Sequence, residues 1–166
     1  MCIRDRGGSA VSFTAGATNL SDVDSTTYDK LTLSFTQSNF ADGANEQLVF
    51  NGASSGGTIS HLAALTSSSS GSIVIGATTY AYTTAVSGGI ATLTFTGASN
   101  AELTQSQAEA LLDAMRYQNT SENPTTGSSR VFSLRPTDGS ALDGNTATFT
   151  VTVAAVNDAP LSLIHI

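Results

Sequence analysis

The sequence predicts an all-β protein, a two-layer β-sandwich of about eight strands with one inserted crossover helix. Apolar residues recur at every second position in short runs, the period of strands that bury one face. Clusters of Gly, Ser, Asn and Asp separate these runs, as turns do. One segment, 103–117, changes to the roughly 3.6-residue period of a helix.

The strands expected in the first half of the chain follow this alternation. The clearest places Leu31, Leu33 and Phe35 on one face and threonine or serine on the other. The segments 73–75 and 79–83 flank Gly76-Ala77, so we expect them to form a hairpin. Further strands are expected around Val11 and Phe13, at 47–50, and around Leu93 and Phe95, while the Gly- and Ser-rich segment 51–58 is expected to be a loop.

The helix is expected at about 104–117. Thr104 and Gln107 match a capping box, in which the threonine oxygen accepts a hydrogen bond from a free N–H of the first turn. Its apolar face would be formed by Ala108, Leu111, Leu112 and Met115, which recur at helical spacing.

Two strands are expected after the helix. The first begins at Phe132 and Leu134 and reaches Asp138-Gly139, a sequence that favours a turn. The last places Phe149, Val151 and Val153 opposite a row of threonines. Its alternation stops before Pro160, which cannot continue a ladder.

The two terminal hexapeptides differ in composition from the rest and resemble translated read-through of sequencing adapters. We therefore expect 1–6 and 161–166 to be non-native scars and 7–160 to be a single domain. Cys2 is the only cysteine, so the segment between the scars has no disulfide.

Charge and hydropathy disfavour several partners. The net charge is −7, whereas binding to nucleic acid or to anionic lipid requires a basic surface. No apolar run approaches the roughly 20 residues that span a bilayer, so direct membrane insertion is not expected.

Acidic and amide side chains at turns and strand ends are the candidate metal ligands. Asp22 and Asp24 stand two apart, so in an extended backbone both can reach one hard cation. Asp138, Glu46 and the pair Asn157-Asp158 are further candidates. Each has an ordinary alternative: an aspartate in a turn often caps its own backbone, Glu46 could face solvent, and Asn157-Asp158 could simply end a strand.

The order of these groups resembles the calcium motifs of cadherin repeats. The chain is most similar to the bacterial cadherin-like tandem repeats of large secreted, RTX-type adhesins. The similarity rests on Ser-Asp-Val-Asp-Ser at 21–25, on Tyr-Gln-Asn-Thr-Ser-Glu-Asn-Pro after the helix at 117–124, and on Val-Asn-Asp-Ala-Pro at 156–160. It spans nearly all of 7–160.

The resemblance implies a cadherin/immunoglobulin-like sandwich that shares calcium with neighbouring repeats of the same chain. The implied ligands are Asp22, Asp24 and Asp138 at the end facing the preceding repeat, and Asn157, Asp158 and Glu46 at the end facing the next. Ala155 and Ala159 stand where metazoan cadherins usually have Asp and Asn, which lowers the expected number of ligands.

The implied function is a structural calcium-binding module, secreted or at the cell surface, that stiffens a tandem array through interdomain calcium. Any host, surface or glycan ligand would be bound through other domains. Catalysis is not expected, because His61 is the only histidine outside the scars and no phosphate-binding loop adjoins a strand–helix unit.

Two other interpretations remain open. In a carbohydrate-binding module, Tyr80 and Tyr82 would share one face of a strand and could stack on sugars if that face is exposed. In a metal-free structural spacer, the acidic residues would only form turns.

Overall fold

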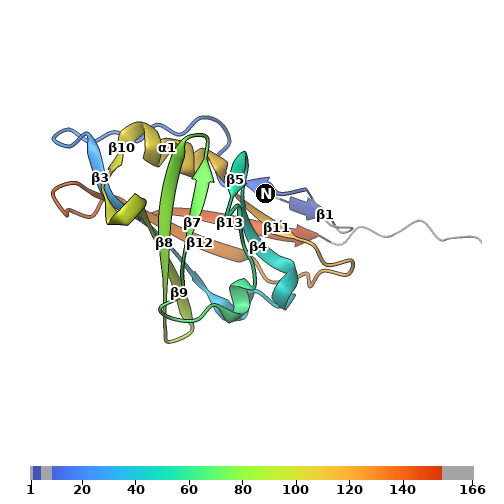
Figure 1. Ribbon diagram of the computed structural model, residues 1–166. Helices are drawn as coiled ribbons and strands as arrows, with labels where there is room; N and C mark the ends of the chain where they lie inside the picture. Colours follow the sequence, from blue (N-terminus) through green and yellow to red (C-terminus); the bar gives the residue numbers. More distant parts are fainter. Residues whose placement is uncertain (1, 5–8, 155–166) are drawn as a thin grey trace, which may run out of the picture.

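The computed structural model describes residues 2–4 and 9–154. Two β-sheets pack against each other with one α-helix beside them, so the all-β sandwich expected from the sequence is confirmed (Figure 1). Every described strand pair is antiparallel except β1 with β13.

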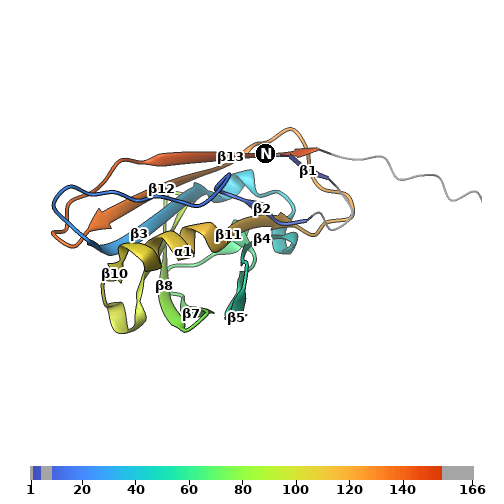
Figure 2. The same ribbon diagram turned by 90° about the horizontal axis from the view of Figure 1, so that it is seen from above.

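The larger sheet has nine strands, in the order β1-β13-β12-β3-β9-β8-β7-β5 with β10 beside β3. They are β1 (Cys2–Arg4), β3 (Thr27–Thr36), β5 (Ala53–Ser55), β7 (Ser70–Ile75), β8 (Thr78–Ser87), β9 (Ile90–Gly97), β10 (Leu103–Thr104), β12 (Arg130–Asp138) and β13 (Ala147–Ala154). The sheet curves, so that β12 and β13 lie on one side and β5, β7 and β8 on the other (Figure 2).

The smaller sheet has four strands in the order β2-β11-β4-β6. They are β2 (Val11–Ser12), β4 (Glu46–Phe50), β6 (Thr58–Ile59) and β11 (Met115–Asn119). The helix α1 (Gln105–Ala114) connects β10 of the larger sheet to β11 of the smaller one, as expected of a crossover helix. Four short 3-10 turns complete the described elements: η1 (Gln37–Asn39), η2 (Gly43–Asn45), η3 (Leu62–Ala64) and η4 (Ala98–Asn100).

The core forms where the alternating apolar faces of the strands meet. Leu33 of β3 pairs with Leu93 of β9 on one side and with Leu134 of β12 on the other. All three side chains are buried, while the serines and threonines between them are less so. The predicted alternation of β3, β9, β12 and β13 is therefore confirmed.

Aromatic rings hold the two sheets together around Phe132 of β12. Its ring centroid lies 4.8 Å from that of Phe13, 5.4 Å from Phe35, 5.5 Å from Phe40 and 5.9 Å from Tyr117. Tyr117 belongs to the smaller sheet and Phe35 to the larger one, so this cluster bridges the layers. Its pairs have the tilted or edge-on geometry that aromatic rings prefer.

The helix is shorter than predicted, and its last expected residues belong to a strand. The capping box is confirmed: Gln107 N donates to Thr104 Oγ1 at 3.3 Å, and Thr104 N donates to Gln107 Oε1 at 2.9 Å. At Met115 the backbone becomes extended, and the chain pairs with β4 as β11. Met115 was assigned to the helix because an apolar residue at this position fits both the helical period and the period of a strand. With ten residues, the helix is too short to cross a membrane.

Several strands carried no pattern in the sequence. β5 lies inside the segment 51–58 that was expected to be a loop, β6 begins at the last residue of that segment, and β10 is only two residues long. Cys2–Arg4, excluded from the fold as part of a scar, pair as β1 with Thr152–Ala154 of β13. The origin of residues 1–6 stays a prediction, and residues 161–166 lie outside the described part of the chain.

Candidate metal centre

Asp22, Asp24 and Asp138 come together at one end of the sandwich. Asp138 is the last residue of β12, and the two other aspartates precede β3. One carboxylate oxygen from each residue lies within 4.8 Å of the others. The end of β12 and the beginning of β3 lie at the opposite end of the domain from the point where the chain leaves β13 (Figure 1).

A bulge fixes the position of Asp138. The register of β12 against β3 shifts between Thr137 and Asp138, and Asp138 then pairs with Tyr28. Its Oδ1 accepts hydrogen bonds from the backbone N–H groups of Ser140 at 2.9 Å and Leu142 at 2.8 Å. Both of these bonds use Oδ1, so Oδ2 remains for a cation. Asp138 is only 5% exposed, which makes it the rigid member of the cluster.

Asp22 and Asp24 are exposed and interact with each other. Asp24 N donates to Asp22 Oδ1 at 3.2 Å, the local turn that such residues often form. A hydrogen bond between their side chains lowers the pKa of Asp22 and raises the pKa of Asp24. The negative charges of Asp22 and Asp138 raise the pKa of Asp24 further. The three carboxylates therefore repel one another, and a shared cation would remove this repulsion.

Further oxygen atoms lie around Gly139, the residue after Asp138, among them a carboxylate that the sequence pattern missed. A Cβ atom placed on Gly139 would contact Thr27 Oγ1 and lie 3.2 Å from Glu102 Oε2 and 3.4 Å from Ser25 Oγ. Glu102 precedes the two-residue strand β10, which leaves no periodic signal in the sequence. The adjoining pocket of about 420 Å³ also presents Asn19, Ser21 and Asn145 beside Asp22 and Asp138. Calcium takes 6–8 oxygen ligands, so the three aspartates need such additions.

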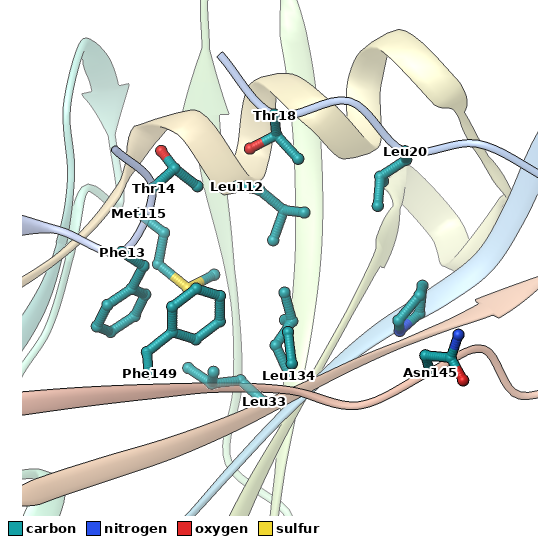
Figure 3. A pocket seen from close by; sticks show the side chains of 12 residues that line it. Phe13, Thr14, Thr18, Leu20, Leu33, Leu112, Met115, Leu134, Asn145 and Phe149 are labelled. Atoms are coloured by element: carbon teal, nitrogen blue, oxygen red, sulfur yellow. The ribbon is translucent and has the colours of Figure 1, made fainter. Parts of the chain in front are cut away.

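A second, apolar pocket adjoins the acidic one. It has a volume of about 160 Å³ and is lined mainly by aromatic and aliphatic side chains, including Phe13, Leu112 and Phe149 (Figure 3). Both pockets are bounded by Leu20, Pro136 and Asn145. The apolar lining offers a cation almost no ligands, so the candidate metal centre is confined to the acidic pocket.

Glu46, a candidate ligand with a solvent-facing position as the alternative, lies elsewhere and is not exposed. Its side chain is fully buried, and Oε1 accepts hydrogen bonds from Arg130 Nε and from the Tyr117 hydroxyl, each at 2.5 Å. Its Oε2 accepts from Asp42 N at 3.0 Å. Both oxygens are therefore used within the protein, and Glu46 acts here as the counterion of Arg130.

Asp42, which the sequence did not single out, completes this buried network. Its carboxylate accepts hydrogen bonds from Asn119 Nδ2 at 2.6 Å, from Thr125 Oγ1 at 2.6 Å and from Arg130 Nη2 at 3.3 Å. Burial would raise the pKa of Asp42, but the hydrogen bonds from Thr125 and Asn119 outweigh burial and lower it. Burial and the bond to Glu46 raise the pKa of Tyr117. The network attaches the loop after β11 to the beginning of β4.

The other two predicted ligands, Asn157 and Asp158, lie outside the described residues. The structure thus brings together three of the six predicted ligands, and the assignment of Asn157 and Asp158 stays a prediction.

Tyr80 and Tyr82 share a face of β8, as expected, but this face points inward. Tyr80 is 1% exposed, and its hydroxyl donates to the carbonyl of Gln107 at 3.0 Å. Tyr82 is half-buried, with its ring centroid 6.2 Å from that of Phe95. The ring also covers Gly71, where an added Cβ would lie 2.6 Å from the tyrosine hydroxyl. The pair therefore offers no exposed platform for stacking on a sugar.

Replacing Asp24 by asparagine should raise the thermal midpoint without calcium, because it removes one of three repelling charges. The same change should weaken the stabilisation that calcium produces, because one ligand charge is lost. In the native protein, calcium affinity should fall as the pH falls toward the raised pKa of Asp24, because protons then compete with the ion. Thermal unfolding with calcium and with chelator measures these effects. Glu122→Gln, at an exposed loop position, is the matched control. Equal responses of the two variants would contradict the assignment.

No protein-family model, curated protein or solved structure matches this chain. The similarity to cadherin-like repeats therefore stays a prediction, based on the motifs in the sequence.

Proposed function

We propose that this domain is a structural calcium-binding module of a large secreted or surface-attached bacterial adhesin. In this proposal it is one cadherin-like repeat of a tandem array, and interdomain calcium stiffens the array. The observation that carries the proposal is the meeting of Asp22, Asp24 and Asp138 within 4.8 Å at one end of the sandwich.

The position of the cluster supports a junction between modules. It lies at the end opposite the exit of β13 (Figure 1), so a neighbouring module that packs against this end of the sandwich would face it. Asp22 and Asp24 are exposed and can reach groups of another module, whereas Asp138 is held by its own loop. A preceding module of the same kind would add its own Asn-Asp pair, corresponding to Asn157 and Asp158.

Electrostatics supplies the mechanism. Without calcium, acidic groups on two linked modules repel each other and the junction bends freely. Calcium replaces this repulsion with shared coordination, so the relative orientation of the modules becomes fixed. Because the ligands are divided between two modules, an isolated domain should bind weakly, with a dissociation constant of roughly 10⁻⁴–10⁻³ M, as extracellular modules do.

A metal-free spacer is the alternative with structural support. The buried network of Arg130, Glu46 and Asp42 joins one end of the domain through ion pairs between its own side chains. If the aspartate cluster binds no calcium, this spacer function would replace the proposal. The carbohydrate-binding alternative is weakened by the inward position of Tyr80 and Tyr82.

Small-angle X-ray scattering of two copies of 7–160 joined in tandem tests the stiffening. We expect a larger maximum dimension in calcium than in chelator, because the junction straightens. A tandem protein with Asp22, Asp24 and Asp138 all changed to asparagine should lose this difference. The same maximum dimension for the native tandem protein in both conditions would contradict the proposed function.

A further inference from the structure

Arg116 differs from the other lysine and arginine side chains of residues 9–154, all of which form ion pairs. Lys30 pairs with Asp29 at 2.9 Å, Arg135 with Asp143 at 2.9 Å, and Arg130 with Glu46 and Asp42. Within the described part of the chain, Arg116 forms no ion pair, and its Nε is the one buried side-chain nitrogen or oxygen without a hydrogen-bond partner. Buried polar atoms are nearly always bonded, so an unpaired guanidinium atom marks an unusual environment.

The acidic residue in the pocket beside Arg116 forms no ion pair with it in the described structure. Asp113 lines the same pocket, but its Oδ1 accepts hydrogen bonds from Thr18 N at 2.8 Å and from Thr18 Oγ1 at 2.6 Å. These bonds hold the carboxylate toward the segment before β3. The guanidinium therefore remains a partly buried cation in a protein of net charge −7.

The pocket beside Arg116 is open and suited to a small polar ligand. It has a volume of about 410 Å³ and combines Arg116 and Asp113 with the hydroxyl groups of Ser12 and Thr14 and the short segment 15–17. Ser12 is the cross-strand neighbour of Arg116 in the pairing of β2 with β11, so their side chains lie on the same face of the smaller sheet. Pockets for small ligands commonly begin at about 300 Å³.

We propose that this pocket binds a hydroxylated monocarboxylate, such as a sugar acid. Because Nε is covered, the carboxylate would meet the edge formed by the two terminal guanidinium nitrogens, which present paired N–H donors. The hydroxyl groups of the ligand would face Ser12 and Thr14. Asp113 and the negative net charge oppose a dianion such as phosphate or sulfate, whereas a single carboxylate neutralises the arginine without excess charge. This site is independent of the calcium proposal, since it shares no residue with the aspartate cluster.

NMR of the arginine side chains tests the proposal directly. The buried Nε–H of Arg116 should exchange slowly with water and give an assignable signal, identified by its disappearance in Arg116→Met. We expect glucuronate to shift this signal saturably, at least about tenfold more tightly than acetate, and glucose to leave it unchanged. The titration is run in chelator, so its outcome does not depend on calcium binding.

Two variants make the test specific. A Cβ on Gly16 would have no neighbour within 4 Å, so Gly16→Phe can narrow the pocket without a clash and should abolish the glucuronate response. Arg135→Lys, which changes an exposed ion pair, should leave it intact. The absence of a saturable shift with glucuronate, or equal affinities for glucuronate and acetate, would overturn the proposal.

Discussion

Replacing Arg130 by leucine is expected to lower the free energy of unfolding by about 3–5 kcal/mol, because it leaves a buried charge unpaired. Arg130 and Glu46 are both fully buried, and Asp42 is nearly so. The change also frees the carbonyl groups of Thr125 and Ser128, which accept hydrogen bonds from Arg130 Nη1 at 3.1 Å and 2.7 Å. Since single domains are stable by about 5–15 kcal/mol, chemical denaturation should detect the loss easily.

The matched control is Arg135→Leu. Arg135 and Asp143 form an ion pair of 2.9 Å, but their side chains are 48% and 46% exposed. Exposed pairs contribute about 0–1 kcal/mol, so this variant should remain close to the native protein in stability. Similar losses for the two arginine variants would show that the buried network does not hold the domain as we describe.

Truncating Phe132 to alanine is expected to cost about 3–5 kcal/mol, because the side chain is fully buried and joins the two sheets. The change removes four ring contacts at once, those with Phe13, Phe35, Phe40 and Tyr117. Partial collapse of the neighbouring rings determines where in this range the loss falls. Equilibrium unfolding in urea measures it.

Ile90→Ala provides the comparison for the core variant. Ile90 begins β9 and is 49% exposed, so its truncation should cost less than about 1 kcal/mol. If Phe132→Ala were as mild as Ile90→Ala, the aromatic cluster would not be the contact that unites the sheets.

The sequence predicted the elements whose side chains alternate over several residues, such as β3, β12 and β13. It could not predict β5, β6 and β10, because strands of two or three residues are too short to show a period. The predicted end of the helix was wrong for a related reason. Met115 is buried in either conformation, and only its pairing with Phe50 of β4 makes it part of a strand.

The acidic residues show where local pattern stops being informative. The turns around Asp22 and Asp138 were visible in the sequence, but their meeting depends on the pairing of Asp138 with Tyr28, two residues that stand 110 positions apart in the chain (138 − 28). Glu102 comes near Gly139 through the pairing of β10 with β3, without any local signal in the sequence.

The burial of Glu46 was not predicted, although the sequence contains a signal for it. It shares the period of Leu48 and Phe50, which puts all three on the buried face of β4. Arg130 likewise shares the period of Phe132 and Leu134 in β12. Two charged residues of opposite sign on apolar faces indicate a buried ion pair, so the pairing of Glu46 with Arg130 could have been proposed from the sequence.

A calcium titration followed by NMR on the single domain tests the central claim most directly. We expect saturable shifts of the backbone signals of Asp22, Asp24 and Asp138–Leu142, with a dissociation constant of roughly 10⁻⁴–10⁻³ M, while the signals of Glu46 and Arg130 remain unchanged. Magnesium at the same concentration should produce weaker effects, since it keeps its water and demands octahedral geometry. Unchanged signals at the aspartate cluster in calcium well above this range would contradict the assignment of a calcium site.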